Sequence, residues 1–198
     1  AMQWSLVGSE MCIRDSSSIT VRFDYTPQGF RAQVIASGKR WYIDPYYVDN
    51  TDLYVSYHKR DYIQKNPRSI CMVDEEASGE ERLSDWVPRE TSGDNLRTYR
   101  LAVATTGEYA QAIAGGGTPT AAGTLAAVVT TVNRVTGIYE IELAIRLTLI
   151  GNNNTIIYTN PATDPFNGNN SAGVLIGESQ TVIDTNIGAA NYDVGHTF

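Results

Sequence analysis

The 198-residue chain contains few of the side chains that bind metals or form disulfides, with only two Cys and two His. A catalytic zinc ion usually takes three protein ligands, commonly His, at characteristic spacings. His58 and His196 are far apart in the sequence, and neither belongs to a zinc-ligand motif. Residue chemistry alone therefore gives this chain no recognisable metal site.

Long apolar runs and an excess of positive charge are also missing. No stretch of about 18 apolar residues is present, so the sequence predicts no transmembrane helix. Lys and Arg number 15 against 22 Asp and Glu, a net charge of -7, whereas nucleic-acid-binding proteins normally present a basic face. Hydrophobic residues make up 42% of the chain, which is enough to bury a core. The composition indicates a folded chain with no nucleic-acid partner.

The first sixteen residues stand apart from the rest. Residues 6–16 (LVGSEMCIRDS) agree with the translation of a transposase-type sequencing adapter. The segment lacks the basic start and the apolar run of a signal peptide. We therefore interpret residues 1–16 as an adapter artefact, rather than a genuine N-terminal segment, and expect the true N-terminus to be missing. Without them Cys12 is lost, and Cys71 has no partner for an intrachain disulfide.

Residues 17–66 are predicted to form a β-meander. Four segments of strand composition are separated by turn residues: 19–25, 30–35, 40–43 and 53–57. Alternation in the first segment places four apolar side chains on one face: Ile19, Val21, Phe23 and Tyr25. Residues 67–96 follow as an exposed acidic linker that contains several Pro and Gly. Linkers of this kind are convenient sites of proteolytic cleavage.

Residues 97–198 alternate between strand and helix patterns. A strand at 99–105 precedes a helix with Thr118 as its N-cap, Pro119 at its first position and Gly137 at its end. The apolar stripe of this helix is Leu125, Val128, Val129, Val132, Val135 and Tyr139. Because the next strand follows directly, this strand–helix–strand unit should join two parallel strands.

The second half of this region repeats the pattern. Strict alternation over residues 141–150 predicts the clearest strand of the chain, near the same-face pair Glu140 and Glu142. A short strand at 155–159 and a loop at 160–170 come next. A second helix then runs from its cap at Ser171 to Gly188, with this buried stripe: Leu175, Ile176, Ser179, Val182, Ile183 and Ile187.

Five segments of this half carry a family resemblance, in the family's own order: 99–109 (YRLAVATTGEY), 131–140 (TVNRVTGIYE), 143–150 (LAIRLTLI), 157–166 (IYTNPATDPF) and 191–198 (NYDVGHTF). They resemble the bacterial branch of the reprolysin-like zinc metallopeptidases, within the metzincins. The resemblance implies an α/β (α+β) fold class. Residues 97–198 would form the N-terminal half of the catalytic domain, with a mixed twisted sheet and two helices. Residues 17–66 would be a pro-region fragment and 67–96 the linker to be cleaved.

The resemblance also implies a chemistry. The family signature is a helix with His-Glu-x-x-His, followed by Gly-x-x-His; the His residues bind zinc, and the Glu is the general base for the zinc-bound water. No such motif occurs in this chain. We therefore expect no catalytic residue and no metal ligand here, and place the motif beyond Phe198. The chain is then an inactive fragment of a secreted zinc metalloendopeptidase that acts on proteins or peptides.

Two residues invite a more specific interpretation. Residues 195–198 (GHTF) are similar to the end of the zinc motif, but no other His precedes His196 closely, so His196 is interpreted as a strand-end or supporting residue. Residues 67–73 (PRSICMV) are faintly similar to a pro-region pattern whose Cys occupies the open zinc position. Cys71 is therefore a candidate cysteine switch, since thiolate binds zinc well; the alternative is an ordinary small residue at a domain edge.

Other clusters give weaker signals. Asp164, Asp184 and Asp193 would form a calcium site only if folding brought them together, which we do not expect. The pattern Asn153-Asn154-Thr155 matches a glycosylation acceptor but carries little information in a bacterial-looking chain. A rival hypothesis for the whole chain is a non-catalytic secreted or surface α/β binding module that kept the scaffold and lost the metal site.

Overall fold

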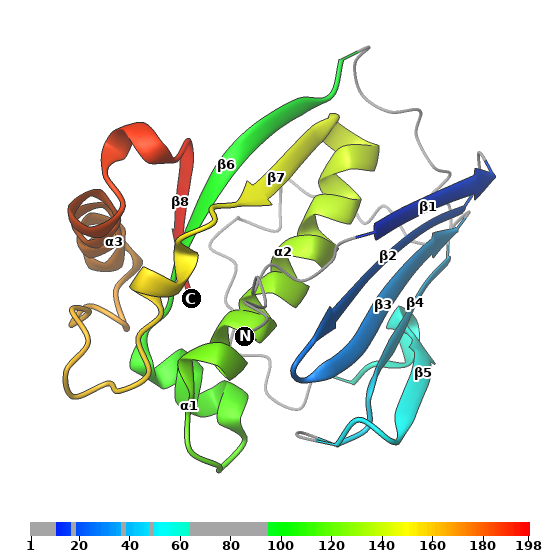
Figure 1. The fold of residues 1–198 in the computed structure, drawn as a ribbon, viewed down its shortest axis with the longest axis horizontal. Coiled ribbons are helices and arrows are strands. Elements are labelled where there is room, and N and C mark those ends of the chain that lie inside the picture. The colour runs from blue at the N-terminus through cyan, green and yellow to red at the C-terminus, as the bar shows by residue number, and fades with distance from the viewer. Residues whose placement is uncertain (1–10, 17–18, 37–38, 48–49, 64–94) are drawn as a thin grey trace, which may run out of the picture.

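A computed structural model of the chain describes residues 11–16, 19–36, 39–47, 50–63 and 95–198. Four layers follow one another in Figure 1: helix α3 (Ala172–Asn186), a parallel sheet, helix α2 (Ala121–Leu143) and an antiparallel sheet. The mixed α/β fold class predicted from the sequence is confirmed. In the described part of the chain, every helix is too short or too polar to cross a membrane.

The antiparallel sheet, here called the meander, contains five strands, each paired with the next along the chain. They are β1 (Met11–Ser16), β2 (Ile19–Thr26), β3 (Gly29–Ala36), β4 (Lys39–Pro45) and β5 (Tyr54–His58), and the turn η1 (Lys59–Asp61) follows. The four predicted strands are confirmed. Strand β1 comes from the residues interpreted as adapter. Pairing at the edge of a sheet uses backbone groups that residues of almost any sequence can offer. The presence of β1 therefore does not test whether these residues come from an adapter.

The second sheet has the strand order β7-β6-β8, and all three strands are parallel. The strands are β6 (Arg97–Ala104), β7 (Ile145–Leu149) and β8 (Val194–Thr197). The predicted parallel unit β6–α2–β7 is confirmed. Where the resemblance implies a mixed sheet and two helices, the described residues form three parallel strands and a third helix, α1 (Gly107–Ala114). The Thr106 hydroxyl caps α1 by accepting from the Tyr109 N–H.

Both predicted ends of α2 are wrong. Its N-cap is Thr120, whose hydroxyl accepts from the Gly123 N–H, so Thr118 and Pro119 lie before the helix. The helix passes through Gly137 and ends at Leu143, and its C-cap residue Ala144 has a left-handed φ of 52°. Residues 141–143 are therefore helical, because extending an existing helix costs less than starting a new element. Glu140 and Glu142 lie on α2 and are not a same-face strand pair.

Further along the chain one prediction is wrong and another is confirmed only in part. In place of a strand at 155–159, the chain forms the turn η4 (Asn153–Ile156) and a single bridge between Thr105 and Ile157. The predicted second helix is α3, and Ser171 is its N-cap residue, although the Ser171 side chain makes no capping bond. In its predicted stripe Ile176 is 71% exposed, whereas Val182, Ile183 and Ile187 are buried. The turn η5 (Ala189–Asn191) then leads to β8.

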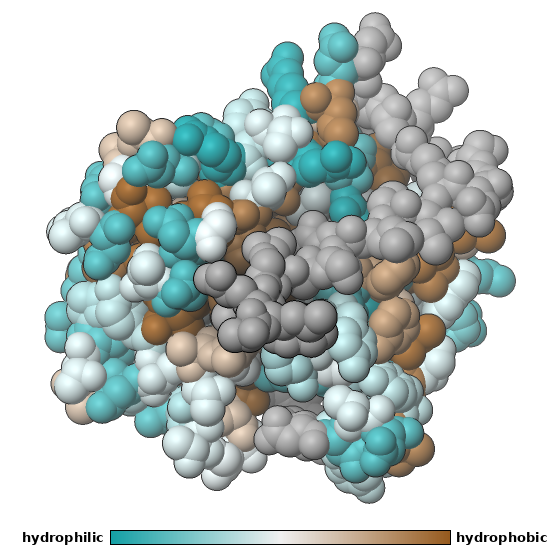
Figure 2. Space-filling view, viewed as in Figure 1, coloured by the Kyte–Doolittle hydropathy of each residue, from teal (hydrophilic) through white to brown (hydrophobic). Residues whose placement is uncertain are grey.

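Each face of the parallel sheet packs on a helix. Leu101 and Val103 of β6 join the apolar stripe of α2, while Ala102 and Ala104 join Val182 and Ile183 of α3. The period-two alternation of a strand produces this division. The space-filling view in Figure 2 shows apolar surface beside α3 and at the edge of the meander away from α2.

Candidate functional site

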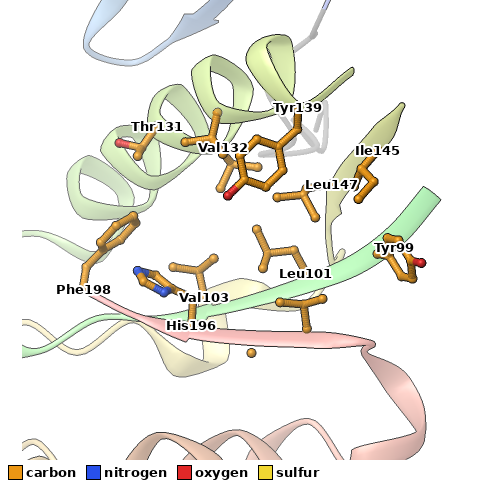
Figure 3. Close-up of a pocket in the computed structure, with 13 residues that line it drawn as sticks. Tyr99, Leu101, Val103, Thr131, Val132, Tyr139, Ile145, Leu147, His196 and Phe198 are labelled. Carbon is orange, nitrogen blue, oxygen red and sulfur yellow. The ribbon is translucent and has the colours of Figure 1, made fainter. Parts of the chain in front are cut away.

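An apolar cleft of about 510 Å³ lies between α2 and the parallel sheet. Leu101 and Val103 of β6 point into it from the sheet, and Val132 and Tyr139 point into it from α2 (Figure 3). Its other lining residues are Tyr99, Thr131, Val135, Ile145, Leu147, Val194, Gly195, His196 and Phe198. The alternation of β6 and the stripe of α2, both visible in the sequence, together build this surface.

Aromatic rings close one end of the cleft. Phe198 stacks on Tyr109 of α1 with ring centroids 5.0 Å apart, and His196 meets Phe198 edge-on at 4.7 Å. Partial burial beside these rings lowers the pKa of His196 below its usual range. The imidazole is therefore neutral at neutral pH. Such a surface favours the burial of apolar side chains and offers no acid–base pair.

The described residues do not fit a catalytic zinc ion. His58 lies on β5 of the meander and His196 on β8 of the other sheet. Within the ranges that the structure describes, no group of three or more His, Cys, Asp or Glu could hold a metal. Cys71, the candidate switch, and nearly all of the predicted linker at 67–96 lie outside the described residues.

The three Asp residues considered for calcium take part in three separate contacts. Asp164 accepts from the N–H groups of Gly107 and Phe166 and so fixes the start of α1. Asp193 pairs with Arg100 at 2.7 Å, and the hydrogen bonds from Arg100 lower the pKa of Asp193 to about 2. Hydrogen bonds from Gln180 and Tyr192 likewise lower the pKa of Asp184. Folding does not bring these carboxylates together.

Asn153 is a structural residue that sequence reasoning missed. Its side chain is 2% exposed, and its amide bonds both the N–H and the C=O of Val103 at 2.8 Å. Strand β7 pairs with β6 only as far as Leu101. The Asn153 amide therefore bonds the Val103 backbone groups that a neighbouring strand would otherwise bond. A buried amide with this role is unavailable for glycosylation, so the acceptor pattern at this position is misleading. No local signal in the sequence separates the two roles.

Comparison with known proteins identifies the domain that holds the cleft. The sequence model of the Reprolysin-like group in metallo-peptidase family M12B matches residues 95–198, more than half of the chain. No curated protein and no solved structure matches the chain. The matched residues include the parallel sheet, the three α-helices of the described residues and the whole lining of the cleft. On this match, the chain belongs to the reprolysin-like metallo-peptidases of family M12B.

Proposed function

We propose that residues 97–198 are the N-terminal half of the catalytic domain of a secreted, bacterial zinc metalloendopeptidase. Its substrates would be proteins or peptides. The zinc ligands and the general base would be supplied by residues beyond Phe198, since the described residues cannot supply them. The observation that carries the proposal is an open apolar cleft inside the domain that the family model matches.

The two faces of the parallel sheet differ in how completely they are covered, and this difference supports the proposal. Helix α3 packs on Ala102 and Ala104 from one side. On the other side α2 leaves Tyr139 and Val194 39% exposed at the border of the cleft. An apolar surface of this kind gains stability when another apolar element covers it. We infer that the zinc-binding helix of the full-length protein packs there, next to Phe198.

The N-terminal part would then be a pro-region. Residues 17–66 form its last fragment, residues 67–96 the linker that is cleaved, and Cys71 a candidate ligand for zinc before cleavage. In a longer chain that contains the zinc motif, Cys71→Ser should make the uncleaved precursor hydrolyse peptides. If the Cys71→Ser precursor remains inactive before cleavage, Cys71 is not the residue that inhibits the precursor.

The decisive experiment extends the reading frame beyond Phe198. A His-Glu-x-x-His motif within roughly a hundred residues is expected, together with one bound zinc per extended chain and hydrolysis of an unstructured protein substrate. Replacing the Glu of that motif by Gln should abolish hydrolysis and leave the zinc in place. The 198-residue chain should bind no stoichiometric zinc, and tight zinc binding by it would contradict this placement of the metal site.

A non-catalytic secreted or surface binding module is the second candidate. It is favoured by the lack of any metal-ligand cluster in the part of the chain that the structure describes. The same extension separates the two candidates. A reading frame that continues without paired His residues, or that stops before them, would favour the binding module.

A further inference from the structure

Helix α2 lies between the parallel sheet and the meander (Figure 1), and the two faces that it turns toward them differ in chemistry. Its apolar stripe, which includes Val128 and Val132, packs on the parallel sheet. The face toward the meander is polar, and these residues contact β2 and β4 from it: Thr130, Asn133, Arg134, Gly137 and Glu140. Their spacing of three or four residues places them in one row along the helix.

The meander meets this row with the polar side of its own sheet. Along β2, Arg22, Asp24 and Thr26 alternate and are 5%, 1% and 7% exposed. The apolar residues between and around them point to the opposite side of the sheet, where Ile19 is 42% and Tyr25 65% exposed. Docking on α2 therefore buries a mainly polar side of the meander, on which Ile35 is a buried apolar residue, and leaves the side that carries Ile19 and Tyr25 out of the contact.

Hydrogen bonds to a single carboxylate form the centre of the contact. The Thr130 hydroxyl donates to Asp24 at 2.7 Å, and the Asn133 amide donates to the other oxygen at 3.2 Å. Toward the start of the helix, the Gln28 amide donates to the Gly123 carbonyl at 3.0 Å. Polar bonds thus extend over most of the length of α2.

Ion pairs of opposite polarity flank this centre. Arg134 of α2 pairs with Asp44 of β4 at 2.6 Å and also lies over the Tyr42 ring. Near the end of the helix the signs reverse, because Arg22 and Arg40 of the meander pair with Glu140 and Glu142 of α2. Reciprocal charges of this kind fix the register of two surfaces. A shifted docking would bring like charges together.

The fit at the end of this row is close but incompletely bonded. A Cβ on Gly137 would lie 2.9 Å from Arg22 Cγ, so only Gly lets the strand approach the helix here. Nearby, Arg22 Nε, Gln33 Oε1 and Asn133 Oδ1 find no hydrogen-bond partner within the described ranges. Buried polar atoms without partners weaken a contact, since water would bond them in the separated state.

We propose that the contact between the meander and α2 is an interface built to open. The meander is then a separable partner for the polar face of α2, held by charge and hydrogen bonds rather than by a shared apolar core. Permanent interfaces are more apolar than this, whereas contacts between separable domains are polar and return both surfaces to water at low cost. Cleavage between residues 63 and 95 would leave two pieces whose association depends on salt. This inference does not require the zinc site.

The test uses the full chain with a site-specific protease sequence inserted between residues 63 and 95. After cleavage, the two pieces are followed by size-exclusion chromatography in about 0.1 M and about 1 M salt, where the Debye length falls from about 10 Å to about 3 Å. We expect one species at low salt and two at high salt. A single species under both conditions, or precipitates that contain both pieces in equal amounts, would overturn the proposal.

Matched variants separate interface charge from general stability. Arg134→Gln removes the pair with Asp44 and should weaken association at low salt on the order of tenfold or more. Arg100→Gln removes the Arg100–Asp193 pair, which lies in the other sheet, and should leave association unchanged. If Arg134→Gln and Arg100→Gln had the same effect on association of the two pieces, the charges between α2 and the meander would not hold the meander in place.

Discussion

Asp24 of β2 accepts a 2.7 Å hydrogen bond from the hydroxyl of Thr130 in α2, across 106 positions of sequence. Both side chains are buried, at 1% and 5% exposure. Burial raises the pKa of Asp24 above its usual value of 3.8, although the hydrogen bonds from Thr130 and Asn133 oppose this rise. One carboxylate thus links the N-terminal sheet to the family-matched domain, and its bonds contribute to the contact between the two.

Replacing Thr130 by Val tests how much this hydrogen bond contributes to the free energy of unfolding. The substitution keeps the shape of the side chain but leaves an oxygen of Asp24 without its donor. A buried acceptor that loses its partner costs about 1–3 kcal/mol, with the larger values for charged groups. We expect the free energy of unfolding in urea to fall by that amount. The control is Thr181→Val in α3, whose exposed hydroxyl bonds only its own helix and whose loss should change stability by less than about 0.5 kcal/mol.

The second prediction concerns two helical glycines in different surroundings. Gly→Ala in a helix interior normally stabilises by about 0.5–1 kcal/mol. Gly177 of α3 has no atom near the position of an added Cβ, so Gly177→Ala should show this gain. At Gly137 the same methyl would meet buried Arg22 at 2.9 Å, so Gly137→Ala should destabilise despite its better helix propensity. Equal gains in thermal unfolding would show that the contact between β2 and α2 is loose.

The raised pKa of Asp24 predicts a pH dependence of definite sign. A raised carboxyl pKa means that the folded chain favours the protonated form. The stabilising contribution is full below pH 3.8, the value of the unfolded group, and is lost as pH rises through the folded pKa. In urea unfolding at several pH values, wild type should therefore lose stability relative to Asp24→Asn as pH rises across this window. If the difference in unfolding free energy between the two proteins did not change with pH, the pKa of Asp24 would not be raised in the folded chain.

Local patterns in the sequence located most of the strands, although the strand expected at 155–159 does not form and the one expected from 141 begins at Ile145. Alternation and turn residues located β2 to β5, and the strand expected at 99–105 corresponds to β6, because each of these signals lies within a few residues. The stripe from Leu125 to Tyr139 likewise predicted the face of α2 that packs on the parallel sheet. The family followed from short motifs in the matched region, and the comparison confirms it.

What the sequence could not show depends on distant partners. Alternation in β2 placed Phe23 and Tyr25 on one face but could not tell that Arg22 and Asp24, on the other face, would be covered by α2. The end of α2 was misplaced for a related reason. Gly137 signals a stop in isolation, yet here it makes room for Arg22 from a strand more than a hundred residues away.

The last prediction tests the contact that completes the parallel sheet. Beyond the end of β7, the Asn153 amide bonds both backbone groups of Val103 at 2.8 Å, and Asn153→Ala would leave both without partners in the core. Two orphaned backbone groups should cost on the order of 2–4 kcal/mol, measured by urea unfolding. Asn152→Ala, next to it but exposed, should change stability by less than about 0.5 kcal/mol. Asn153→Asp separates the two bonds, since a carboxylate can accept from the Val103 N–H but cannot donate to its carbonyl. If Asn153→Asp were as stable as wild type, the bond to the carbonyl would be dispensable, and only the bond to the N–H would support β6.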